Sequence, residues 1–193
     1  MRLRTAALCA LLLVPGCASR EPAAAPATPG PTAIPSGALG IGTYATSAAW
    51  RRLTFDIPAN DVWTGASEDA SGFALRIGDA SMGVIAFPKG ATTYDALLRT
   101  LRTTPGLTKS ADEVTKPVDG NDAWHLTWNV TKPVTLKAGG RTFTFATGEH
   151  NHAIVVSAPE APLLVLMAAR DETAFRRVYD QGHLVVFSMR IGA

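Results

Sequence analysis

The stretch Ala123–Val130, AWHLTWNV, decides the fold class, because apolar and polar residues alternate along it with a period of two. Successive side chains of a β-strand point to opposite faces of the sheet. One face of this strand would carry Trp124, Leu126, Trp128 and Val130. The opposite face would carry Ala123, His125, Thr127 and Asn129. We therefore predict a strand in which Trp124 and Trp128 fill the core.

The same alternation recurs along most of the chain. It predicts further strands within residues 52–58, 73–78, 82–87, 134–145, 152–157, 163–168 and 184–191. The segment 134–145 should form a hairpin with Gly139 and Gly140 at its tip, because glycine adopts positive φ angles at little cost.

Two segments have the period of a helix instead. In residues 92–102, the apolar positions at helical spacing are Tyr94, Leu97, Leu98 and Leu101. Thr92 is the expected N-cap of this helix, and Pro105–Gly106 should end it.

The second helix should begin at Asp171 and end at Gly182. Its apolar stripe would consist of Phe175, Val178 and Tyr179. A run of strands interrupted by two isolated helices predicts an α+β fold, in which an antiparallel β-sheet is flanked by two main helices.

The first residues have the pattern of an export signal. Two arginines precede the nine apolar residues Ala6–Val14, which are too few for a transmembrane helix of roughly 20 residues. The run ends in Val14-Pro15-Gly16-Cys17, which resembles the lipobox of bacterial lipoprotein signals. The resemblance implies that residues 1–16 are a signal peptide and that Cys17 becomes the fatty-acylated N-terminus on the extracytoplasmic face of the cell membrane. Simple secretion and a retained anchor are the alternatives.

Residues 17–40 are expected to form a disordered tether. Seven Ala, five Pro and three Gly occupy 15 of the 23 positions from Ala18 to Gly40. Such a composition buries too little apolar surface to offset the entropy that is lost on folding. Residues 41–193 would then form a single α+β domain. Because Cys9 would leave with the signal peptide, this domain has to be stable without a disulfide bond.

The charge of the chain argues against a nucleic-acid partner. The full sequence has 18 Lys and Arg residues against 16 Asp and Glu residues. Loss of Arg2 and Arg4 with the signal peptide leaves 16 of each, and no run of basic residues remains. The mature chain therefore lacks the electrostatic attraction on which nucleic-acid binding depends.

Three short motifs resemble those of the Mog1/PsbP-like group. They are LTFDIPANDVW (53–63), VDGNDAW (118–124) and, after a helical segment, VVFSMRI (185–191). The resemblance extends over roughly Tyr44–Ile191, and several actinobacterial lipoproteins are similar to this group. It implies an antiparallel sheet flanked by helices. The functions of the group are diverse and mostly non-catalytic, so the resemblance assigns no active residue.

The segment GEHNH (148–152) carries the best candidate for a metal site. His150 and His152 are two residues apart on an expected strand and would project from the same face. His125, with Asp122, is the candidate for completing the site, which needs three or four converging ligands. The sequence does not show whether these strands meet. A solvent-exposed edge of the sheet is the interpretation we prefer here, with no metal or other cofactor.

Motifs for nucleophilic catalysis and nucleotide binding are absent. The sequence has no G-x-S-x-G elbow, no Walker motif and no dinucleotide-binding glycine motif. Trp50 and Trp63 flank the first expected strand of the domain, where an exposed tryptophan would line a pocket or a partner surface.

Together with the lipobox, these observations predict a lipid-anchored, extracytoplasmic binding or assembly domain without catalytic activity. Its partner, a protein or a small molecule, is not identified by the sequence. Two alternatives remain open. One is a small metal-dependent or hydrolytic enzyme that uses His150, His152 and His125. The other is a carrier of a hydrophobic small molecule, which requires a deep apolar cavity.

We expect the Cys17→Ala variant to move from the membrane to the soluble fraction. Each buried methylene of an acyl chain contributes about 0.8 kcal/mol of membrane affinity, and this contribution is lost with the acylated residue. Immunoblots of the two fractions measure the shift, and Cys9→Ala is the control that should stay on the membrane. Unchanged retention of Cys17→Ala would contradict the lipid anchor.

Overall fold

The computed structural model describes residues 30–47, 52–58, 63–111 and 113–192. The signal peptide, Cys17 and Trp50 lie outside these ranges, so what we expect of them stays a prediction. Neither of the helices within the described ranges is long and apolar enough to cross a membrane.

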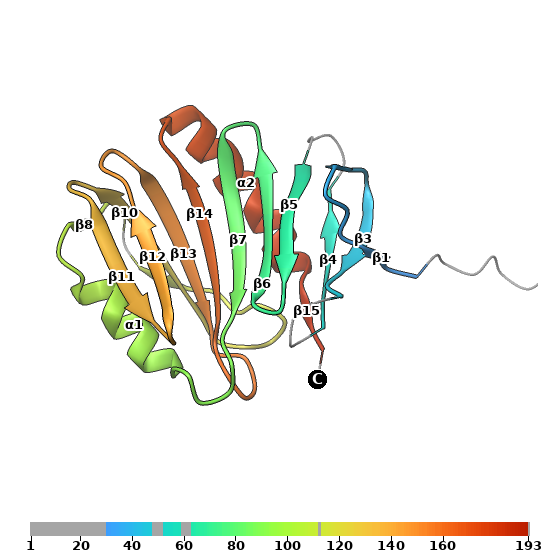
Figure 1. Cartoon of the computed structure of the whole chain (residues 1–193), viewed down its shortest axis with the longest axis horizontal. Helices are drawn as coiled ribbons and strands as arrows, with labels where there is room; N and C mark the ends of the chain where they lie inside the picture. The colour runs from blue at the N-terminus through green and yellow to red at the C-terminus, as the bar shows by residue number, and fades with distance from the viewer. Residues whose placement is uncertain (1–29, 48–51, 59–62, 112, 193) are drawn as a thin grey trace, which may run out of the picture.

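The largest element of the described fold is a nine-stranded antiparallel sheet (Figure 1). From one edge to the other its strands are β2 (Ala38–Leu39), β5 (Trp63–Asp69), β6 (Gly72–Ile77), β7 (Ala80–Ala86), β14 (Leu163–Ala169), β13 (His150–Val156), β10 (Ala123–Val130) and β8 (Leu107–Lys109). The short strand β9 (Val114–Thr115) also pairs with β10. The predicted α+β class with an antiparallel sheet is confirmed.

Two smaller sheets complete the β-structure of the described residues. The first contains, in spatial order, β1 (Thr32–Ala33), β3 (Gly42–Ala45), β4 (Leu53–Ile57) and β15 (Arg190–Ile191). The second is the predicted hairpin of β11 (Val134–Ala138) and β12 (Arg141–Phe145). Its turn residues Gly139 and Gly140 have φ angles of 55° and 78°, in the left-handed region that glycine adopts readily.

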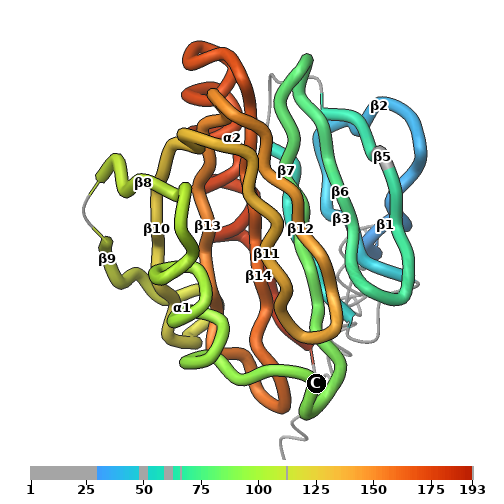
Figure 2. The backbone as a smooth tube through the Cα atoms, turned by 60° about the vertical axis from the view of Figure 1, so that its left-hand side comes forward, coloured from blue at the N-terminus to red at the C-terminus, as the bar shows by residue number. Residues whose placement is uncertain are grey.

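The two helices cover opposite faces of the main sheet. Helix α2 (Glu172–Ser188) and strand β4 pack on one face, and α1 (Tyr94–Thr103) and the β11–β12 hairpin pack on the other (Figure 2). Each face has its own hydrophobic core. Trp128 is buried in the core under α1, and Trp124 packs against it, as predicted. Both faces of β10 are therefore covered.

Helix α1 begins one residue later than the sequence pattern predicts. Thr93, not Thr92, is its N-cap, and the Thr93 hydroxyl accepts a hydrogen bond from the Ala96 N–H at 3.2 Å. The predicted apolar stripe is present, with Leu97, Leu98 and Leu101 buried.

Helix α2 does not end at Gly182 but continues to Ser188. The strand predicted within residues 184–191 is therefore wrong, and only Arg190–Ile191 (β15) forms a strand there. Gly182 lies where the helix meets the sheet, and a Cβ there would be 2.7 Å from Met167 Cε and 2.8 Å from Met167 Sδ. The glycine therefore permits a close approach and does not serve as a cap. The buried stripe continues past it, from Val178 to Val185 and Val186.

The domain also begins earlier than predicted. Strands β1 and β2 lie within the expected tether 17–40, and they pair with β3 and β5. Leu39 is buried in the core, and the Gly65 N–H donates to the Gly37 carbonyl at 3.0 Å. Residues 32–39 are thus part of the fold. The edge strand of a sheet has backbone N–H and C=O groups without partners, and these can hydrogen-bond to an extended segment.

We expect Gly65→Ala to detach this N-terminal segment from β5. A Cβ at Gly65 would overlap the carbonyl oxygen of Pro35, and forcing extra atoms into such a contact typically costs about 1–3 kcal/mol. Hydrogen exchange followed by mass spectrometry should show faster exchange of residues 32–39.

Gly83→Ala is the matched control for this variant. Its Cβ would lie 3.6 Å from Ile85 Cδ1, which is an ordinary contact, so protection of residues 32–39 should not change. Equal protection in Gly65→Ala and the wild type would show that the segment does not pack on β5 as described.

Candidate metal centre

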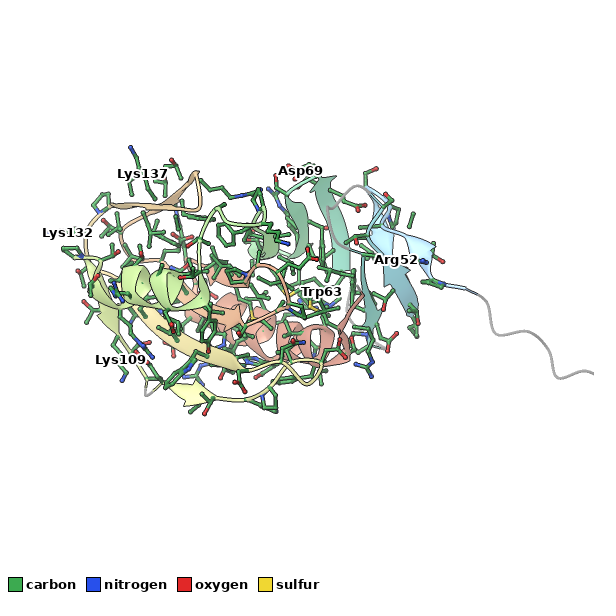
Figure 3. All side chains as sticks on the ribbon, turned by 90° about the horizontal axis from the view of Figure 1, so that it is seen from below. Arg52, Trp63, Asp69, Lys109, Lys132 and Lys137 are labelled. Carbon is green, nitrogen blue, oxygen red and sulfur yellow. The ribbon has the colours of Figure 1, made fainter. Side chains whose placement is uncertain are left out.

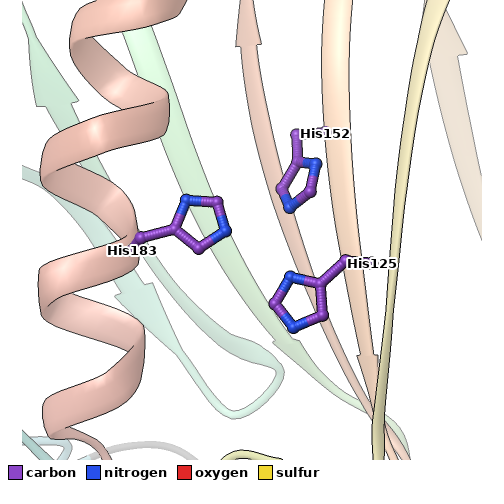
Figure 4. A group of neighbouring side chains, drawn as sticks. All are labelled: His125, His152 and His183. Atoms are coloured by element: carbon purple, nitrogen blue, oxygen red, sulfur yellow. The ribbon is translucent and has the colours of Figure 1, made fainter. Parts of the chain in front are cut away.

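Three histidines from distant parts of the sequence converge above one face of the main sheet (Figure 4). His152 on β13 lies opposite Thr127 on β10, and His125 lies two residues before Thr127, so both imidazoles project from the same face. Helix α2 covers this face and contributes His183. One nitrogen from each ring can be chosen so that all three lie within 4.8 Å of one another.

The three rings are packed tightly. The exposed fraction is 2% for His152 and 3% for His125, and His183 is partly buried. The ring centroid of His152 lies 4.9 Å from that of His183 and 5.5 Å from that of His125. The Tyr179 ring packs against His152 at 4.8 Å and against His183 at 4.3 Å, which restricts the orientation of both.

Hydrogen bonds assign the tautomer of two of the rings. His125 Nε2 lies 3.2 Å from the Lys116 carbonyl oxygen, and His183 Nδ1 lies 2.7 Å from the Tyr179 carbonyl oxygen. A carbonyl can only accept, so these two nitrogens carry the hydrogen. In the neutral rings the other nitrogens, His125 Nδ1 and His183 Nε2, therefore have a free lone pair.

His152 has an unpaired nitrogen in the interior. Its Nδ1 is 2.8 Å from the Thr127 hydroxyl, whereas its buried Nε2 has no hydrogen-bond partner among the described residues. A buried polar atom without a partner typically costs about 1–3 kcal/mol. An atom that costs stability and lies beside two other imidazoles is the strongest sign of a ligand at this site.

The surroundings keep the three imidazoles neutral. Burial, together with the neighbouring His183 and His125, lowers the pKa of His152 to about 3. Burial is also the main cause of the lowered pKa of His125 and of the lowered pKa of His183. Only the neutral form of imidazole binds a metal ion, so at pH 7 no proton has to be displaced.

The donor set fits a divalent transition metal. Imidazole nitrogen is a ligand of Zn²⁺, Cu²⁺, Ni²⁺ and Fe²⁺, whereas Ca²⁺ and Mg²⁺ prefer oxygen. Tetrahedral zinc with bonds near 2.0–2.1 Å places its nitrogens about 3.3 Å apart. The three nitrogens lie within 4.8 Å of one another, so they would have to move closer together to bind zinc. Three protein ligands leave one coordination position open.

A cavity of about 430 Å³ adjoins the histidines. Its walls are formed by Val114, Lys116, His125, Tyr179, Asp180, Gln181, His183, Leu184 and Phe187. The Lys116 ammonium lies 3.8 Å from the centre of the Phe187 ring. The cavity therefore combines charged groups and apolar side chains beside two of the three candidate ligands.

The structure changes the set of candidate ligands. His125 and His152 come together as the metal-site hypothesis required, but His150 and Asp122 do not belong to the converging group of the described residues. His150 Nδ1 instead lies 2.8 Å from Asn129 Oδ1, and its ring packs against Phe175.

The expectation of a solvent-exposed edge at 148–152 is wrong for His152 and for Asn151, which are both buried. Strand β13 lies between β14 and β10, inside the main sheet. Helix α2 packs on β13 on the side of His152, whereas Asn151 projects from the opposite face, where strand β12 lies.

The sequence pattern missed His183 as a candidate metal ligand. The helix predicted from the sequence ended at Gly182, so His183 lay outside it. A signal was present, because Phe175, Tyr179, His183 and Phe187 recur at intervals of four residues, the spacing of one helix face. All four rings contact one another in series along α2.

The sequence left open whether Trp63 lines a pocket or a partner surface, and the structure places it in the core. Its side chain is fully buried in the core between the main sheet and β4. Figure 3 shows Trp63 inside the molecule, whereas Lys109, Lys132 and Lys137 lie at the surface. Trp63 is the first residue of β5, and its ring packs into the core instead of lying exposed at a loop end.

No family model matches this sequence, and no curated protein sequence matches it significantly. The solution structure of cyanobacterial PsbP (CyanoP) from Synechocystis sp. PCC 6803 is similar over 86% of this chain and 98% of that one, with 14% identity and a TM-score of 0.46. The crystal structure of LpqN, involved in cell envelope biogenesis of Mycobacterium tuberculosis, is similar over 79% of this chain and 92% of that one, with 15% identity and a TM-score of 0.40. Likenesses of this degree carry no inference about function.

We expect the metal-free protein to lose stability on acidification. The pKa of His152 is about 3 in the folded state, whereas an unfolded histidine has a pKa of about 6.5. Below pH 6.5 the unfolded chain therefore binds the proton first, and stability declines from there down to about pH 3. At pH 5 this residue alone should account for about 2 kcal/mol of lost unfolding free energy.

Urea unfolding at pH 8 and pH 5, with a chelator present, measures this loss. In His152→Asn the side chain no longer titrates, so the difference between the two pH values should be smaller by about 2 kcal/mol. The same pH dependence in the variant and the wild type would contradict the low pKa of His152.

Proposed function

We propose that this chain is a lipid-anchored extracytoplasmic binding protein whose folded domain binds one divalent transition metal ion through His125, His152 and His183. The unpaired, buried Nε2 of His152 beside the two other neutral imidazoles carries this proposal. A metal ion would bind the lone pairs of His125 and His183 and would give Nε2 of His152 a partner, with Nδ1–H of His152 donating to the Thr127 hydroxyl. Binding would also relieve the cost of burying an unsatisfied nitrogen.

The location outside the cytoplasm rests on the sequence. The export signal, the lipobox at Cys17 and the Ala/Pro-rich stretch that follows support an anchored domain. An extracytoplasmic site suits histidine ligands, because imidazole does not oxidise to a disulfide as cysteine does in that compartment.

A second candidate function, metal-dependent hydrolysis, is favoured by one observation. Three nitrogen ligands leave a coordination position for water, and the carboxylate of Asp180 lines the same cavity as His125 and His183. Zinc lowers the pKa of its bound water to about 7 in catalytic sites. Binding remains our first proposal, since Asp180 is exposed and no side-chain hydrogen bond found among the described residues holds it against a histidine.

We expect one equivalent of Zn²⁺ to bind and to stabilise the protein. A ligand at a hundred times its dissociation constant adds about 2.7 kcal/mol to the free energy of unfolding, so the thermal midpoint should rise and should return after chelation. Calorimetric titration gives the stoichiometry and thermal unfolding gives the shift. His152→Asn, His125→Asn and His183→Asn should each abolish most of the stabilisation.

His150→Asn is the matched control, because His150 lies on the same strand and face as His152 but outside the converging group. It should keep the stoichiometry and the thermal shift of the wild type. A shift that His150→Asn removes and His152→Asn preserves would overturn the proposed set of ligands, as would the absence of any zinc binding.

A further inference from the structure

We infer that the cavity beside the three histidines binds a small carboxylate with an apolar chain, whose carboxylate group occupies the open position of the metal and contacts Lys116. This inference rests on the proposed metal site and names the class of ligand that the site would take. Two sets of groups in the cavity wall carry it, one charged and one apolar.

The charged groups favour an anion. Lys116 lines one cavity with His125 and His183, and its ammonium lies over the Phe187 ring, which packs against both histidines. A bound divalent ion would add two positive charges. Asp180 also lines the cavity, but its single negative charge is outweighed by the metal and Lys116 together. A carboxylate oxygen can coordinate zinc and can accept a hydrogen bond from an ammonium group.

The apolar groups favour a ligand with a hydrocarbon chain. The large hydrophobic side chains that are strongly exposed in the described residues are Ile41, Val114 and Leu184. Val114 is 54% exposed and Leu184 is 52% exposed, and both lie in the wall of this cavity. Exposed apolar side chains that gather at a concave site mark a binding surface.

The two sets of groups define the orientation of the ligand. Phe187 borders the charged groups, because its ring contacts the Lys116 ammonium and packs 6.0 Å from the ring of His125. The carboxylate would point to the histidines, and the chain would pass over Phe187 towards Leu184 and Val114. A volume of about 430 Å³ lies within the range of small-molecule sites.

Cobalt(II) is the probe for this test, because its visible absorption reports a change in coordination. The full chain carrying Cys17→Ser is loaded with Co²⁺ and titrated separately with hexanoate, acetate and hexanol. Hexanoate should change the spectrum and bind at least about tenfold more tightly than acetate, since each buried methylene is worth about a factor of four. Hexanol, which has no carboxylate, should leave the spectrum unchanged at the same concentrations.

Three variants separate the contributions of the cavity wall. Leu184→Ser should weaken hexanoate binding about fivefold to tenfold and leave acetate binding unchanged. Lys116→Gln should weaken both ligands by about threefold or more, because it removes a partly screened charge. Ile41→Ser is the control, since Ile41 is also a large apolar residue and is 74% exposed but does not line the cavity. It should change neither affinity.

The outcomes distinguish this inference from the proposed function. If Co²⁺ binds at the histidines but hexanoate binds no more tightly than acetate, the inference is overturned and the metal site stands. The same holds if Leu184→Ser and Ile41→Ser have equal effects. If Co²⁺ does not bind, or binds equally to His152→Asn, the metal site and the inference fail together.

Discussion

The close approach of α2 to the main sheet at Gly182 is the constraint on which the rest of the structure depends. Without a side chain there, the helix lies directly on the sulfur atoms of Met167 and Met82. The next residue, His183, is thereby brought to the histidines of the sheet, and Val185 and Val186 are buried further along. A larger residue at 182 would lift the helix and would separate His183 from His125 and His152.

The histidine cluster works against the stability of the metal-free domain. Its rings are desolvated, its pKa values are lowered, and one nitrogen of His152 is left unpaired in the interior. The two hydrophobic cores on either side of the sheet have to offset this cost. A bound metal ion would turn the same three groups into a stabilising site, so under our proposal stability and metal binding are linked.

The order of the strands places the candidate site and the N-terminal segment, which would carry the proposed anchor, near opposite edges of the main sheet. The N-terminal segment joins the main sheet through β2 at one edge, whereas His152 and His125 lie on β13 and β10 near the other (Figure 1). Strands β5, β6, β7 and β14 separate the two regions. In an anchored protein the cavity would therefore lie away from the point where the tether enters the domain, and a soluble ligand would have access to it.

The sequence by itself determined the class of the fold and most of its elements. Alternation along AWHLTWNV, the Gly139–Gly140 turn and the leucine spacing of α1 are local patterns, and local backbone geometry is enough to produce them. Only the tertiary structure decided the length of α2, the burial of Trp63 and which histidines belong to the candidate metal site. The reason is physical: a glycine can end a helix or admit a close contact, and two histidines can be solvated or buried. Which of these occurs depends on what packs above them, and that partner lies far away in the sequence.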